Sequence, residues 1–151
     1  MVSAVISDAS CLIILSEIGS LHLLFEAYGP VVTTPTVAQE FGMELPEWVS
    51  IQAPSSMPNF PPSIDRGEAS AIALALETPN SILIVDEKTA RNYAIRLGLE
   101  ITGTLGVIVR AKLKGAVPSI RPFVEAVRRK GFRFSTAVEA EAYRQAGEVE
   151  R

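Results

Sequence analysis

The sequence is poor in the residues that zinc sites and nucleophilic triads require. Its 151 residues include one cysteine, Cys11, and one histidine, His22. A lone cysteine cannot form an internal disulfide, and neither residue has other ligands at the spacing of a zinc site. A single histidine among leucines gives little support to a Ser–His–acid triad, and the absence of a glycine-rich phosphate loop argues against an NTPase. We expect Cys11 to lie in the core and the protein to be cytoplasmic.

Long apolar runs are also lacking. Asp8 and Glu17 interrupt the richest one, so no membrane span is expected, and residues 2–6 form too short a run for a signal peptide. Apolar residues still make up 48% of the chain and charged residues 21%, which is typical of a globular domain with a substantial core. The length predicts one domain, which we place at residues 1–134, with residues 135–151 as its helical extension.

Basic residues are nearly absent from the first part of the chain. Up to Glu87 there are eleven acidic residues and one basic residue, a net charge of −10. From Lys88 onward there are six acidic and thirteen basic residues, a net charge of +7, and the two parts sum to −3. One interpretation is that the later helices carry solvated basic faces. The other is an acidic part that binds metal and a basic part that attracts phosphates.

Short apolar runs alternate with helical patterns, which predicts an α/β fold with a parallel sheet covered by helices. Strands are expected at residues 2–7, 31–33, 81–85 and 99–102, with an edge strand at 48–53. Residues 44–64 hold half of the ten prolines and should form a loop. Thr34-Pro35 predicts a helix start that ends near Gly42. Other helices are expected at residues 11–18, 21–28, 66–77, 88–97, 104–114, 119–130 and 136–148.

Acidic residues follow two of the predicted strands directly. Asp8 comes after residues 2–7, and Asp86-Glu87 comes after residues 81–85. Ligands of open α/β sheets bind outside the carboxyl ends of strands, so these carboxylates should share one edge. Each residue alone is better explained as a helix N-cap, but together they favour a site.

Two glutamates on helices are further candidates. Glu68 lies in the first turn of a helix of small residues, where it is either a surface residue that stabilises the helix dipole or a ligand. Glu40 lies near the end of the Pro35 helix and is a weaker candidate. A cluster of such carboxylates repels itself unless a cation neutralises it, and hard oxygen ligands suit Mg²⁺ or Mn²⁺.

Five segments, in this order, resemble the PIN domain, and in particular a prokaryotic PIN-like branch described as nucleic-acid-binding. They are Asp-Ala-Ser-Cys-Leu-Ile from Asp8, Thr-Pro-x-Val-x-x-Glu from Thr34, Gly-Glu-Ala-x-Ala-Ile-Ala-Leu-Ala from Gly67, Leu-Ile-Val-Asp-Glu from Leu83, and Gly98–Val107. The resemblance covers residues 3 to about 130. It implies a three-layer α/β/α fold with a central, mostly parallel sheet.

The resemblance also implies the roles of single residues. It makes Asp8, Glu40, Glu68 and Asp86 the catalytic, metal-binding acids, with Glu87 as a further metal ligand. Ser10 and Thr104 match hydroxyl positions that orient carboxylates or contact phosphate. Basic candidates for guiding the strand by its phosphates are Lys88, Arg91, Lys112 and Lys114. Many toxin-type PIN domains have Asp where Glu68 stands, and the Glu68 side chain is one methylene longer.

The predicted function is that of a metal-dependent endoribonuclease, with Mg²⁺ or Mn²⁺ as cofactor and RNA as substrate. The family further implies a homodimer and a toxin–antitoxin setting with a small antitoxin partner. We also expect Leu and Ile on residues 12–18 and 21–28, or the helix at 104–114, to bury in that dimer. The alternatives are a non-catalytic module that binds nucleic acid or protein, and an aspartyl-phosphate phosphatase. Ser10 stands where such a phosphatase requires a second Asp.

Overall fold

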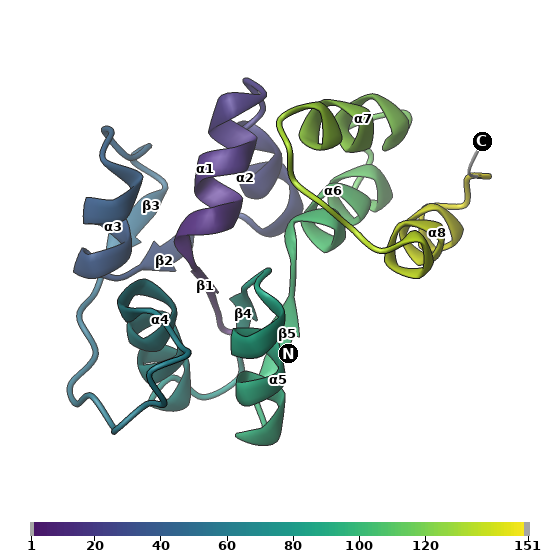
Figure 1. The fold of residues 1–151 in the computed structure, drawn as a ribbon. Helices are drawn as coiled ribbons and strands as arrows, with labels where there is room; N and C mark the ends of the chain where they lie inside the picture. The colour runs from purple at the N-terminus through teal and green to yellow at the C-terminus, as the bar shows by residue number, and fades with distance from the viewer. Residues whose placement is uncertain (1, 150–151) are drawn as a thin grey trace. The chain divides into compact units, whose positions relative to one another are not determined.

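A computed structural model describes residues 2–149, which form five strands and eight helices (Figure 1). The chain divides into two compact units. The first contains the described residues up to Ile13 together with Pro30–Gly103, and the second contains Ile14–Gly29 and the described residues from Thr104 onward. The predicted domain limit after residue 134 stays a prediction. Within residues 2–149, no helix has the length and apolar character needed to cross a membrane.

The first unit is built on a sheet of five parallel strands in the order β3-β2-β1-β4-β5. The strands are β1 (Ala4–Ser7), β2 (Val31–Thr33), β3 (Val49–Ile51), β4 (Ser81–Ile84) and β5 (Glu100–Thr102). The predicted α/β fold is therefore confirmed, with a sheet that is parallel throughout these strands. Ser7 pairs with Ile84 at the end of the central β1–β4 ladder. This register brings two strands that are distant in sequence to the same edge.

Three helices complete this unit, and a fourth begins in it. They are α3 (Pro35–Phe41), α4 (Arg66–Leu76) and α5 (Lys88–Arg96), while α1 (Ala9–Glu17) starts directly after Asp8 and crosses the unit boundary. Gly67–Ala75 of α4 is buried at every position, because its small side chains let the helix approach β1 and β4 closely. A shared core joins α4 and α5 to the sheet through Ile6, Ile72, Leu74, Leu83, Val85, Ala90 and Ala94.

Local signals set the start and end of α3. The Thr34 hydroxyl accepts a hydrogen bond of 3.1 Å from the Val37 amide, and Pro35 occupies the first helical turn. Gly42 ends the helix in the left-handed conformation, with φ of 73°. The Thr34 hydroxyl also lies 2.7 Å from the Ser70 hydroxyl, so the start of α3 is tied to α4 in the buried interior.

The second unit is helical. It contains the C-terminal part of α1 with α2 (His22–Tyr28), α6 (Thr104–Leu113), α7 (Arg121–Arg129) and α8 (Thr136–Gln145). Helix α6 packs against α2, α7 and α8. Arg110 of α6 donates a 2.8 Å hydrogen bond to the Ala27 carbonyl, and its guanidinium lies 4.7 Å from the centre of the Tyr28 ring. Cys11, by contrast, is buried as expected in the first unit.

The apolar surface that motivated a dimer at residues 12–18 and 21–28 is largely absent. Leu12, Leu15, Leu23 and Leu24 have exposed fractions of 0%. These leucines are buried within the chain itself, so the argument that they form a dimer surface was wrong. A homodimer, and the burial of the helix at residues 104–114 in it, stay predictions.

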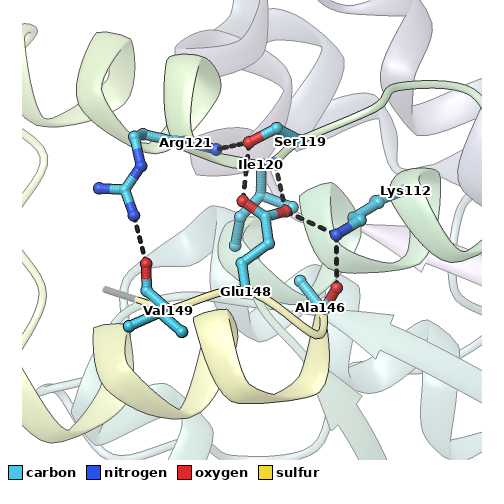
Figure 2. Close-up of polar contacts among 7 residues, drawn as sticks. All are labelled: Lys112, Ser119, Ile120, Arg121, Ala146, Glu148 and Val149. Atoms are coloured by element: carbon cyan, nitrogen blue, oxygen red, sulfur yellow. Dashed lines mark hydrogen bonds and ion pairs between the residues drawn. The ribbon is translucent and has the colours of Figure 1, made fainter. Parts of the chain in front are cut away.

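A polar cluster around Glu148 holds the C-terminal segment of the second unit (Figure 2). Its carboxylate accepts hydrogen bonds from the Ser119 hydroxyl at 2.7 Å, and from the Ile120 amide and Lys112 ammonium at 2.9 Å. Burial alone would raise the pKa of Glu148, but these donors outweigh it and hold the pKa below its usual value. The Ile120 bond also satisfies an amide just before α7, which lacks a side-chain cap of its own.

We predict that Glu148→Ala destabilises the protein, because it removes the acceptor that three donors share. The loss of unfolding free energy in urea should be about 1–3 kcal/mol at neutral pH. Because the pKa is depressed in the folded state, this stabilisation should also fade as the pH drops through that pKa. Glu141→Ala is the matched control, since it breaks an exposed pair with Arg144 and should change stability little. Equal effects of the two substitutions would contradict the role given to Glu148.

Candidate active site

Asp8 lies at the carboxyl edge of the sheet and is buried. Its amide donates a 3.0 Å hydrogen bond to the Ile84 carbonyl, which extends the β1–β4 ladder by one step. Asp86 follows β4 by two residues, so both acids lie at the same edge, as the sequence led us to expect. The Thr33 hydroxyl donates a 2.7 Å hydrogen bond to the Ser7 carbonyl and fixes the backbone just before Asp8.

Two acids at the start of α4 form a capping box. The Asp65 carboxylate accepts a 2.8 Å hydrogen bond from the Glu68 amide, and the Glu68 carboxylate accepts one of 3.2 Å from the Asp65 amide. Glu68 is buried, so the interpretation as a surface residue was wrong, although it does support the helix start. Asp65 was not among the residues predicted from the sequence. The Asp-x-x-Glu spacing before an apolar helix could have revealed it.

Glu40 reaches the same region from α3. A Cβ atom added to Gly67 would overlap the Glu40 carboxylate, so the missing side chain at Gly67 leaves the space that Glu40 occupies. Glu40 itself is exposed near the end of its helix. Glycine at position 67 thus lets a flexible carboxylate lie directly over the first turn of α4.

Four acids lie close enough that their charges repel one another. We call them the acidic cluster: Asp8, Glu40, Asp65 and Glu68. Burial is the main cause that raises the pKa of Asp8 from 3.8 to about 7, and the charges of Glu68, Asp65 and Glu40 raise it further. Burial and the Asp65 charge raise the pKa of Glu68 from 4.5 to about 7. The pKa of Glu40 is also raised, by partial burial of its carboxylate and by the Asp65 charge. The cluster therefore holds more negative charge than its surroundings stabilise.

The residues after β4 have more specific partners. Glu87 is the N-cap of α5, where its carboxylate accepts hydrogen bonds from the Thr89 and Ala90 amides at 3.0 and 2.9 Å. These bonds lower its pKa. Arg91 donates a 2.8 Å hydrogen bond to the Val85 carbonyl, and Lys88 is exposed. The structure therefore gives Glu87 a capping role and anchors Arg91 to the strand end.

Gly103 provides the second close approach at this edge. A Cβ at position 103 would lie 2.7 Å from an Asp86 carboxylate oxygen and 3.0 Å from a guanidinium nitrogen of Arg91. Asp86 and Arg91 therefore both lie against the backbone of Gly103, directly after β5. The position of Asp86 depends on this glycine just as the position of Glu40 depends on Gly67.

The remaining predicted residues lie in different surroundings. Ser10 is half-buried in the first turn of α1, and Thr104 is the buried first residue of α6 in the second unit. Lys112 is committed to the Glu148 cluster, where it also donates a 2.6 Å hydrogen bond to the Ala146 carbonyl. It is a structural residue and no longer a phosphate candidate. Lys114 is exposed just after α6.

Comparison with known proteins agrees with this fold. A family model described as a PIN domain matches residues 4–148, nearly the whole chain. The chain belongs to the PIN-domain family. No curated protein and no solved structure is significantly similar to it. The membership confirms the resemblance seen in the sequence, and it argues against the phosphatase alternative, because PIN domains are generally nucleases.

PIN-domain nucleases typically use divalent metal ions, and the donors of the acidic cluster fit such an ion in chemical type. They are carboxylate oxygens whose mutual repulsion a cation would relieve, as Mg²⁺ or Mn²⁺ requires. Among residues 2–149, no three His, Cys, Asp or Glu side chains converge closely enough to hold a metal ion as they stand. The arrangement therefore supplies charge and donors at one edge, without a preformed coordination shell.

The raised pKa of Asp8 predicts how stability changes with pH in the metal-free PIN domain. The pKa of Asp8 is 3.8 when unperturbed and about 7 in the fold. The contribution of Asp8 to folding stability is therefore fully present below its unperturbed pKa and is lost as the pH rises through its folded-state pKa. Asp8→Asn should therefore be more stable than the wild type at about pH 8, on the order of a few kcal/mol, and similar to it at about pH 4.

Urea denaturation at both pH values, in EDTA, measures this difference. Glu44→Gln is the control, because Glu44 is an exposed acid whose neutralisation should change stability equally little at either pH. If Asp8→Asn is less stable than the wild type at both pH values, the Asp8 carboxylate is stabilising and the prediction is wrong.

Proposed function

We propose that this PIN domain is a divalent-metal-dependent endoribonuclease whose acids Asp8, Glu40, Glu68 and Asp86 bind the ion and catalyse hydrolysis of RNA phosphodiester bonds. The observation that carries the proposal is the position of buried Asp8 at the carboxyl edge of the sheet, among the acids that surround the start of α4. The PIN fold is nuclease-like, and this edge is where open α/β sheets bind ligands.

A buried carboxylate near other carboxylates is costly unless something compensates its charge. Within residues 2–149, no salt bridge is found to Asp8, Glu40, Asp65 or Glu68. Arg66 lowers the pKa of Glu40 but does not offset the burial and the Asp65 charge. The cost is understandable if the natural occupant of this edge is a cation.

A bound Mg²⁺ or Mn²⁺ would supply an activated water and stabilise negative charge on the scissile phosphate. The protein's own part is to hold the donors. Asp8 is fixed by the strand ladder, Glu68 by the capping box, and Glu40 by the space over Gly67. Asp65 positions Glu68 through the same capping box and adds charge beside it. The charge of Glu87 raises the pKa of Glu68 further, while the Glu87 carboxylate itself caps α5.

Further parts of the proposal concern substrate and partners. Ser10 would orient carboxylates or contact phosphate, and Lys88 with Arg91 would contact the RNA backbone. Arg91 is already oriented toward the strand end by its bond to Val85. A toxin role with a small antitoxin partner and a homodimer belongs to the same proposal and rests on the family resemblance.

One observation favours a second candidate, a non-catalytic PIN-like module that binds nucleic acid or protein. The acids within residues 2–149 do not converge into a ready metal site, and Glu68, Asp65 and Glu87 each serve as helix-capping residues. Such a module would keep the fold and the capping bonds while losing catalysis. Metal-dependent cleavage separates the two candidates.

The decisive prediction is that Asp8→Asn abolishes Mn²⁺-dependent cleavage of single-stranded RNA while the protein stays folded. Removal of a carboxylate that binds the ion should lower the rate by at least about 10²-fold. Glu68→Gln should do the same if Glu68 binds the ion, and should change cleavage little if it only caps α4. The assay uses purified full-length protein, mixed-sequence RNA and added Mn²⁺, with gel readout.

EDTA and the exposed-acid variant Glu44→Gln are the controls for this assay. EDTA should stop cleavage by the wild type, and Glu44→Gln should cleave like the wild type. Cleavage that persists in both EDTA and Asp8→Asn would mean that a contaminant or another site is responsible. Absence of cleavage by the wild type with Mn²⁺ and with Mg²⁺ would favour the non-catalytic module.

A second prediction uses Gly67→Ala. The added methyl group must displace the Glu40 carboxylate, which can move because it is exposed at the end of a flexible side chain. Folding stability should change by less than about 1 kcal/mol, since alanine also favours the helix. The increase in melting temperature caused by millimolar Mn²⁺ should nevertheless shrink. Ala71→Gly, elsewhere on α4, is the control: it changes helix propensity and removes a buried methyl group, and it should leave the metal effect intact.

A further inference from the structure

The cations of the second unit fall into two groups. Most are held by partners within that unit: Arg110 by the Ala27 carbonyl, Lys112 by Glu148, Arg121 by the Val149 carbonyl, Arg128 by Glu139, and Arg144 by Glu141. Figure 2 shows two of these cations, Lys112 and Arg121, directed at their oxygen partners. These side chains already have oxygen partners within the unit.

The other group has no such partners within the described residues, and most of its members lie at or just after the end of α7. In the part of this unit that the structure describes, the side chains of Lys114, Arg129, Lys130 and Arg133 have no hydrogen bond or ion pair. All four residues are exposed. Three of them lie within residues 129–133, and the neighbouring Arg128 is neutralised by buried Glu139.

The backbone of this segment is well defined. Helix α7 ends in a Schellman arrangement, in which the Gly131 amide bonds the Arg128 carbonyl at 2.9 Å and the Phe132 amide bonds the Val127 carbonyl at 3.3 Å. Gly131 adopts φ of 92°, a left-handed conformation that favours glycine. The three cations are therefore presented from a fixed turn, which lowers the entropy cost of binding through them.

Two aromatic residues alternate with the cations. Phe132 and Phe134 are half-buried, with ring centres 5.3 Å apart and ring planes tilted by 57°. Rings that are only half-covered retain a surface on which a nucleic-acid base can stack, and every base has a face suited to this contact. Basic side chains interleaved with aromatic rings match the two parts of a single strand, its phosphates and its bases.

We propose that residues 129–134, which we call the basic turn, bind single-stranded RNA. Arg129, Lys130 and Arg133 contact the phosphates, and Phe132 with Phe134 offers a stacking surface for a base. The choice of RNA as the ligand rests on the proposed function. The basic turn is a binding surface and has no part in the cleavage chemistry.

The test measures RNA affinity of the full-length protein in EDTA, where metal-dependent cleavage is off, by anisotropy of a short labelled single strand. The double variant Arg129→Gln with Arg133→Gln should bind about tenfold more weakly at moderate salt, and the slope of log affinity against log salt should flatten by about 1.4, since each lost phosphate contact removes about 0.7. The matched control, Arg96→Gln with Arg144→Gln, removes the same charge from exposed helix positions and should bind like the wild type.

The aromatic contact needs its own variants. Phe132→Leu keeps apolar bulk but removes the aromatic face, and should weaken binding by roughly tenfold without changing the salt slope. Phe132→Trp should restore affinity. Equal weakening by both double variants would mean that only net charge matters and would overturn the proposal, as would wild-type affinity in the Arg129 and Arg133 variant. Loss of binding in that variant, with no cleavage by the wild type in Mn²⁺, would support the basic turn and refute the nuclease.

Discussion

Because β1 and β4 pair in parallel with Ser7 opposite Ile84, the chain leaves two central strands at the same edge of the sheet. An acid follows each strand, and the small residues of α4 let a further pair of acids approach. Repulsion among Asp8, Glu40, Asp65 and Glu68 is the constraint on which the site depends. This repulsion contributes to the raised pKa of Asp8 and Glu68. It favours binding of a cation at this edge and disfavours binding of another anion.

Two glycines give this edge its geometry. Gly67 leaves the space over α4 in which the Glu40 carboxylate lies, and Gly103 admits Asp86 and Arg91 to the backbone after β5. Neither has a positive φ, so each is needed for close approach and not for an unusual backbone conformation. Each glycine affects the site by leaving space for a neighbouring carboxylate. Glu68 likewise has two separate effects. Its capping bond stabilises the start of α4, and its negative charge is available to a ligand.

The charge asymmetry of the sequence also has a structural counterpart. The acidic cluster lies in the first unit, and the second unit contains the described cations that follow Gly103. Many of those cations donate hydrogen bonds within the unit, as Lys112 does in the Glu148 cluster. The ends of helices leave amides and carbonyls that need such partners. What distinguishes the basic turn is that its side chains satisfy none of these internal needs. A strand of RNA, which carries one charge per phosphate, would interact favourably with such a surface.

Elements whose ends are set by local chemistry could be predicted from the sequence. The strand at residues 31–33 and the helix between Thr34 and Gly42 were predicted at their observed positions, because a threonine cap, a proline and a left-handed glycine act within a few residues. The pattern of strands followed by acids also placed Asp8 and Asp86 at one edge.

Which charges meet, in contrast, depended on the packing of the whole chain. Lys112 pairs with Glu148 and is not a phosphate contact, and the leucines of α1 and α2 are buried in the core. Burial and pairing depend on residues far apart in the chain, and no local spacing encodes them.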